Sequence, residues 1–159
     1  MDNAIYVHIL IDTLTKKNSL LDKLIQITTM QEEYITLTPP DIDNFETSLN
    51  EKETLIEKIN EIDEGFEKIY EHVKEEITSN KINHKEDILE LQSLIKQVTE
   101  KSAKLQALEI RNKKSLEIFF SNKKKEIKDF KQSSKTASNY YKNMMNQQSG
   151  ESYFLDKKN

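Results

Sequence analysis

Apolar residues recur along most of the chain at alternating steps of three and four, the spacing that places side chains on one face of a helix. The first such row predicts a helix from about residue 3 to residue 37. Its apolar members are Val7, Ile11, Leu14, Leu21, Ile25 and Ile35, and Asn18 and Thr28 are polar positions in the same row. Pro39 disfavours a helical conformation at Thr38 and therefore ends this helix.

A second row predicts a helix over residues 39–79, and a third row predicts one over residues 85–131. Nine of the eleven positions in the second row are apolar, and the exceptions are Lys52 and Asp63. We expect Pro40 in the first turn of the second helix, where its missing N–H costs nothing. The third row includes the polar positions Ser102, Glu109, Asn112 and Lys123. Buried asparagines such as Asn18 and Asn112 are expected to fix the register of the helices.

Three long helices joined by short links should fold back on one another. The predicted fold class is all-α, an elongated antiparallel bundle of three long helices with a flexible C-terminal tail. Residues 1–131 are expected to form this coiled-coil-like domain. The periodicity fails after Lys131, so residues 132–159 are interpreted as the flexible tail.

Composition agrees with long helices. Only 35% of the residues are hydrophobic and 33% are charged, and a coiled-coil helix needs only about two apolar positions in seven. With only two Gly and two Pro, the chain has few of the turn-forming residues that hairpins or phosphate-binding loops need. The absence of Cys removes disulfides and thiolate chemistry.

Charge is distributed unevenly along the chain. Residues 39–80 carry a net charge of -9 and residues 113–159 a net charge of +6, whereas the whole chain sums to -4. We expect the basic end to lie along the acidic second helix, through pairs that are individually weak. The 23 lysines against the single Arg111 argue against a nucleic-acid partner, because Arg is preferred for reading phosphates and bases.

No pattern for catalysis, a cofactor or a metal is present. His8 with Asp12, and His72 with Glu76, have the i, i+4 spacing of a metal pair, but neither has an evident third ligand. We interpret these histidines as solvated. No P-loop, nucleophile elbow or dinucleotide fingerprint occurs. We therefore expect no enzyme activity and no cofactor.

Localisation is expected to be cytoplasmic, without membrane insertion. No apolar run approaches the roughly 20 residues of a membrane helix. The first ten residues, MDNAIYVHIL, show no secretory signal.

Two sets of apolar residues are expected to contact partners. If the third helix extends beyond the other two, its end exposes a groove that fits an amphipathic helix of a partner. The residues of this predicted groove are Leu116, Phe119, Phe120, Ile127 and Phe130. The tail carries apolar clusters suited to docking on a second protein, and their members are Tyr140, Tyr141, Met144, Met145, Tyr153, Phe154 and Leu155. Isolated surface hydrophobes need no such explanation, but these are grouped.

Four stretches resemble flagellar export chaperones of the FlgN type, in particular a clostridia-like branch. Residues 50–73 (NEKETLIEKINEIDEGFEKIYEHV) resemble the central helix of that family, and residues 105–120 (LQALEIRNKKSLEIFF) resemble its third helix. The tail stretches YYKN and SYFLDKKN resemble the tail of the clostridia-like branch.

This resemblance implies a cytoplasmic chaperone of flagellar type III secretion. Its clients would be hook–filament junction proteins, bound through their C-terminal amphipathic helices, kept from premature assembly and delivered to the export gate or its ATPase. The family's gate-docking aromatic residue corresponds best to Tyr140 or Tyr141.

The residues themselves leave alternatives open. A structural coiled-coil protein that assembles with itself is one, and a nucleic-acid-associated helical protein is a weaker one. The free state can be a monomer or a homodimer.

Overall fold

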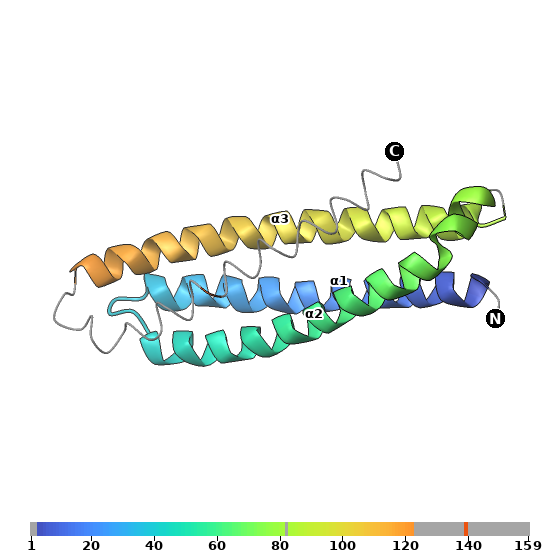
Figure 1. The fold of residues 1–159 in the computed structure, drawn as a ribbon. Helices are drawn as coiled ribbons and strands as arrows, with labels where there is room; N and C mark the ends of the chain where they lie inside the picture. The colour runs from blue at the N-terminus through green and yellow to red at the C-terminus, as the bar shows by residue number, and fades with distance from the viewer. Residues whose placement is uncertain (1–2, 82, 123–138, 140–159) are drawn as a thin grey trace.

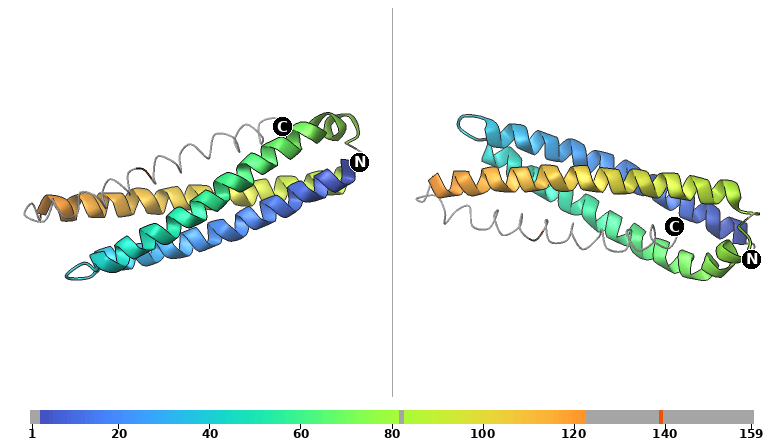
Figure 2. Two further views of the ribbon diagram at one scale, coloured as in Figure 1. Left: turned by 60° about the horizontal axis from the view of Figure 1, so that its bottom comes forward. Right: turned by 90° about the horizontal axis from the view of Figure 1, so that it is seen from above.

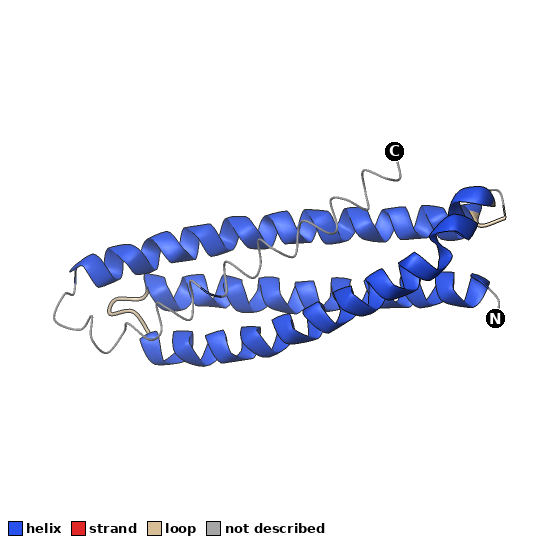
Figure 3. Ribbon diagram, viewed as in Figure 1, coloured by secondary structure: helices blue, strands red, loops and turns tan. Residues whose placement is uncertain are grey.

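Three long antiparallel helices make up the described part of the chain (Figure 1). The computed structural model describes residues 3–81, 83–122 and 139. The helices are α1 (Asn3–Thr36), α2 (Ile42–Ser79) and α3 (Lys85–Asn122). Among the described residues there is no strand (Figure 3). The predicted all-α elongated bundle is confirmed, and at about 1.5 Å per residue the 38 residues of α2 and of α3 each span about 57 Å.

The link between α1 and α2 lies at the predicted place, but α2 begins later than expected. Its first residue is Ile42, not residue 39, and Pro40 is outside the helix. The reason is Asp41, whose carboxylate accepts the backbone N–H of Asn44 at 3.2 Å. The N–H of Asp41 itself donates to the carbonyl of Tyr34 at 2.9 Å. A carboxylate at this position satisfies an N–H that the first turn leaves without a helical partner, so the helix starts after it.

The second link also lies where the sequence predicts it. α2 ends at Ser79 and the backbone N–H of Asn80 donates to the carbonyl of Glu76 at 2.9 Å. α3 begins at Lys85, as expected, with Glu86 and Asp87 in its first turn, where negative charge is favoured by the helix dipole. The predicted extension of this helix to residue 131 lies outside the described residues beyond Asn122.

α1 is the central helix of the bundle. It packs against both α2 and α3 along its length, whereas α2 and α3 approach one another far less. In Figure 1, α2 crosses in front of α1, and the further views show α2 running obliquely to α3 (Figure 2). Most buried apolar residues form one long cluster, in which Leu10, Leu24, Ile59, Leu91 and Leu105 are inaccessible to solvent.

A second, smaller apolar cluster closes the end of the bundle at the first link. Ile35 of α1, Phe45 and Leu49 of α2, and Leu116 of α3 form its buried part. Tyr34 and Phe120 pack against it and are partly buried. This cluster holds the last described turns of α3 against its neighbours.

Candidate functional site

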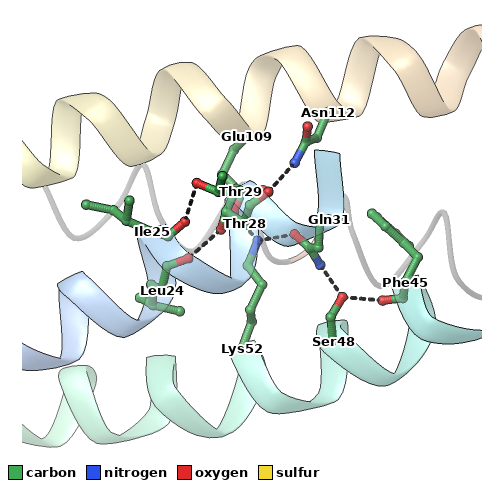
Figure 4. A network of polar contacts seen from close by, with 10 residues as sticks. All are labelled: Leu24, Ile25, Thr28, Thr29, Gln31, Phe45, Ser48, Lys52, Glu109 and Asn112. Atoms are coloured by element: carbon green, nitrogen blue, oxygen red, sulfur yellow. Dashed lines mark hydrogen bonds and ion pairs between the residues drawn. The ribbon is translucent and has the colours of Figure 1, made fainter. Parts of the chain in front are cut away.

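A buried polar network joins all three helices (Figure 4). The side chain of Lys52 on α2 is inaccessible to solvent and forms an ion pair with the Glu109 carboxylate on α3. Lys52 Nζ also donates to Gln31 Oε1 on α1 at 2.7 Å. Thr28 Oγ1 donates to Glu109 Oε1 at 3.1 Å.

The remaining members extend this network. Gln31 Nε2 donates to Ser48 Oγ at 2.7 Å, and Ser48 Oγ donates to the carbonyl of Phe45 at 2.5 Å. Asn112 Nδ2 donates to the carbonyl of Thr28 at 3.0 Å. Each of these buried polar side chains thus has a partner, which is the condition under which a buried network is tolerated.

Burial sets the protonation behaviour of the network. Loss of solvation lowers the pKa of Lys52 from 10.5 to about 8, against the opposing attraction of Glu109. No chemistry follows from this lowered pKa, because Lys52 lies in the packed interior and not in a cleft. Buried ion pairs add little stability but are suited to fixing one register of helices, since any slip leaves charges without partners.

A second ion pair and an asparagine fix α1 against its two neighbours. Lys17 Nζ lies 2.7 Å from Asp63 Oδ1 of α2, and burial lowers the pKa of Lys17 while it raises the pKa of Asp63. Asn18 Nδ2 donates to the carbonyl of Leu94 on α3 at 3.4 Å. The predicted burial of Asn18 and Asn112 between helices is confirmed.

Sequence reasoning missed the pairing of Lys52 with Glu109. Both positions stand in the apolar rows of their helices, so the burial of each could be read from periodicity. The signal in the sequence was that two positions in the apolar rows of different helices carry opposite charges. Their contact needed the relative axial position of α2 and α3.

Each histidine lies near a carboxylate or an aromatic ring of the described helices and links. His8 Nε2 lies 3.6 Å from Asp87 on α3, and His84 Nε2 lies 3.6 Å from Glu76. The ring of His72 packs on Tyr6, with the ring centroids 4.8 Å apart. Over residues 3–81 and 83–122, no group of three His, Cys, Asp or Glu side chains could hold a metal ion.

The predicted partner groove is only partly described. Leu116 is 5% exposed and belongs to the buried cluster with Ile35, Phe45 and Leu49, so the expectation that it lies exposed is wrong. The reason is that α1 and α2 extend far enough to cover this turn of α3. Phe119 and Phe120 are half-buried, with ring centroids 5.7 Å apart.

The other predicted contact residues lie outside the described part of the chain. They are Ile127 and Phe130 of the groove, and Tyr140, Tyr141, Met144, Met145, Tyr153, Phe154 and Leu155 of the tail.

Further apolar surface is available on the described helices. Ile110 and Ile118 of α3 are 61% and 55% exposed. A shallow groove of about 410 Å³ lies between α1 and α2, and its lining residues include Ile27, Leu55, Lys23 and Glu51. These surfaces are suited to contacts with another protein and not to enclosing a small substrate.

Comparison with known proteins supplies a family. The family model described as FlgN protein matches residues 1–148. Neither the curated proteins nor the solved structures contain a match. In the described part of the chain, no helix is both long and apolar enough to cross a membrane.

Proposed function

The chain belongs to the FlgN family of flagellar export chaperones, and on this premise we propose that it binds the C-terminal amphipathic helices of hook–filament junction proteins. Binding in the cytoplasm keeps these clients from assembling early and delivers them to the flagellar export gate or its ATPase. The family match over residues 1–148 is the observation that carries this proposal. It also disfavours the alternative of a structural coiled-coil protein.

The mechanism requires binding and no catalysis. A client that polymerises through amphipathic helices stays apart when those helices have a substitute partner, and a long bundle with apolar rows can supply one. Release follows from competition at the gate, so the chaperone itself needs no nucleotide or metal. We propose that it has no enzyme activity.

We place the client at the end of α3. Phe119 and Phe120 are half-buried there and precede Ile127 and Phe130 in the sequence. Leu116 supports this surface from inside, because it holds the last turns of α3 in the end cluster. Aromatic side chains that are partly exposed on a rigid helix are suited to act as anchors for a partner.

The test is a binding measurement with a purified C-terminal segment of a hook–filament junction protein from the same organism. Burying one aromatic anchor contributes about 1.5–3 kcal/mol, and about 1.4 kcal/mol is tenfold in Kd. The double variant Phe120→Ala, Phe130→Ala is therefore expected to weaken binding at least tenfold by calorimetry. A matched control is Ile5→Ala, Leu89→Ala, which removes two exposed apolar side chains at the opposite end of the bundle.

The control variant should bind the segment like the wild type. Equal binding by both double variants, with the helices intact by circular dichroism, would place the client elsewhere. No binding of the segment by the wild-type chain would contradict the proposed function itself.

A further inference from the structure

The bundle leaves one face of α2 and one face of α3 beside each other with little contact between them. α1 packs against both helices, but α2 and α3 approach one another far less. The buried Lys52–Glu109 pair is a contact that crosses between them. We call this face the α2/α3 seam. A further helix that packed there would make the arrangement a four-helix bundle.

Acidic side chains line the α2 edge of the seam. Ser48 contacts Gln31 of α1, and Leu55 lines a groove with α1, so the opposite flank of α2 faces away from α1. By helical register this opposite flank carries Glu46, Glu53, Asn60, Glu64, Glu67 and Glu71. As a whole, α2 carries 12 acidic and 4 basic side chains.

The α3 edge of the seam adds apolar surface. By the same reasoning from register, Gln106, Ile110 and Lys113 lie on the flank of α3 that faces away from α1. Ile110 is 61% exposed there. An occupant of the seam therefore needs an apolar row flanked by positive charge.

Residues 123–145 of the same chain carry this pattern. An apolar row with steps of three and four is formed by Ile127, Phe130, Ala137, Tyr141 and Met144, with Ser134 as its polar position. The adjacent flank of such a helix would carry Lys124, Lys128, Lys131, Lys135 and Lys142. The segment has seven lysines against Glu126 and Asp129, a net charge of +5.

The chain also has the right starting point and length. α3 ends at Asn122, at the end of the molecule where α2 begins (Figure 1). A segment that turns back there enters the seam at Glu46 and runs parallel to α2. At about 1.5 Å per residue, 23 residues of helix cover about 35 Å, which is shorter than α2. The lysines at 128, 135 and 142 follow a seven-residue spacing, and Glu53, Asn60 and Glu67 follow the same spacing on α2.

We propose that residues 123–145 dock as a helix on the α2/α3 seam of their own chain in the chaperone without a client. The inference goes beyond the proposed function, because it concerns the free chain alone. It also gives Ile127 and Phe130 a second role, since a client that uses them must first displace them from the seam.

The test measures one distance in the free, full-length chain. The chain has no Cys, so Ala107→Cys and Asn143→Cys introduce two unique positions for spin labels. Ala107 is exposed and, by register, lies away from the seam. A docked segment gives one narrow distance distribution by double electron–electron resonance. A broad distribution in the otherwise unchanged chain overturns the proposal.

Charge reversal distinguishes docking of residues 123–145 on the seam from docking elsewhere on the bundle. Glu53→Lys with Glu67→Lys reverses two charges on the acidic edge and is expected to at least double the width of the distribution. Glu57→Lys with Glu61→Lys is the matched control on the exposed outer face of α2 and should leave the width unchanged. The reverse pair, Lys128→Glu with Lys135→Glu, tests the same contact from the segment without altering a described helix.

The charge variants, high salt and dilution with unlabelled chain each give a result that supports or contradicts the proposal. Equal broadening by the seam and control variants, or no broadening by either the seam pair or the lysine pair, contradicts it. High salt should broaden the wild-type distribution, because at about 1 M the screening length falls to about 3 Å. Dilution of the labelled chain with an excess of unlabelled chain should change nothing, and loss of the narrow peak would show exchange between two copies instead.

Discussion

At the scale of single residues, Lys52 and Glu109 place opposite charges inside an otherwise apolar core. Lys52 is inaccessible to solvent and Glu109 is nearly so. Taking both charges out of water costs several kcal/mol for each ion. The attraction between the charges offsets this desolvation cost only when every remaining donor and acceptor has a hydrogen-bond partner. Gln31 and Thr28 supply these additional hydrogen bonds.

Breaking the pair from one side is therefore expected to be costly. Glu109→Leu leaves Lys52 buried without its counter-charge and should lower the free energy of unfolding by about 3–5 kcal/mol. The double variant Lys52→Met, Glu109→Leu removes both charges and should be close to the wild type or more stable. Urea denaturation of the wild type and of these two variants measures both effects. A double variant no more stable than Glu109→Leu would contradict this account.

The lowered pKa of Lys52 predicts a pH dependence of stability. Its pKa in the folded chain is about 8, against an ordinary value of 10.5. Below about pH 8 the lysine is charged in both states, so the full cost of burying the charge is present. Between these two values the unfolded chain binds a proton that the folded chain has lost, so the free energy of unfolding rises with pH.

The matched reference is the double variant Lys52→Met, Glu109→Leu, which keeps Lys17 and every other titrating group. The stability of the wild type relative to this variant should increase from pH 8 toward pH 10.5 in urea denaturation. Parallel stability curves over this range would show that Lys52 does not titrate there.

At the scale of elements, the start of α2 is decided by a side chain and not by the two prolines before it. Asp41 accepts the N–H of Asn44 through Oδ1 and the side-chain amide of Asn44 through Oδ2, at 3.2 and 2.6 Å. These contacts hold the end of the helix beside the buried cluster that contains Phe45. The position of this cap therefore affects how the whole end of the bundle is anchored.

Removal of the cap has a defined expected cost. Asp41→Ala should lower the free energy of unfolding by about 1 kcal/mol, because one N–H at the helix start loses its acceptor. Asp41→Asn keeps an acceptor oxygen at the same place and is the matched control, with most of the stability retained. Chemical denaturation measures both variants. Equal losses for the two would mean that the negative charge, and not the acceptor, matters at this position.

At the scale of the whole molecule, the long bundle and the remainder of the chain are expected to serve different partners. We propose that Tyr140, Tyr141, Met144 and Met145 dock at the export gate while the bundle holds the client. The spacing places Tyr140 with Met144, and Tyr141 with Met145, one turn apart on a helix. Ordering such a segment costs free energy, so the contact should be weak enough to release after each delivery.

Deletion of residues 137–159 separates these two roles. The truncated chain should bind the purified client segment at least as well as the full chain, but the cells should no longer export the client. Secretion of the client into the medium and calorimetry on the purified proteins measure the two effects. Loss of client binding on truncation would assign the tail to the client surface instead.

The helices could be predicted from the sequence alone, because periodicity and composition are local properties. The family was suggested separately, by the resemblance of particular stretches of the chain to FlgN-type chaperones. The steps of three and four predict α1 within one residue of its observed ends, and they predict the start of α3 at Lys85. The periodicity places the start of α2 three residues too early, because it does not show that the side chain of Asp41 caps the helix.

Only the tertiary structure decided which faces meet. Periodicity shows that Lys52, Glu109 and Leu116 lie in the rows that face a core, but not which helix lies opposite each of them. That depends on the axial offset and the angle between helices, which are set by packing over the whole length of the bundle. For this reason Leu116, expected on the surface, is buried at the end of the bundle, and two charges far apart in the sequence form one buried pair. The same packing places α1 between its neighbours, so that α2 and α3 contact one another far less than each of them contacts α1.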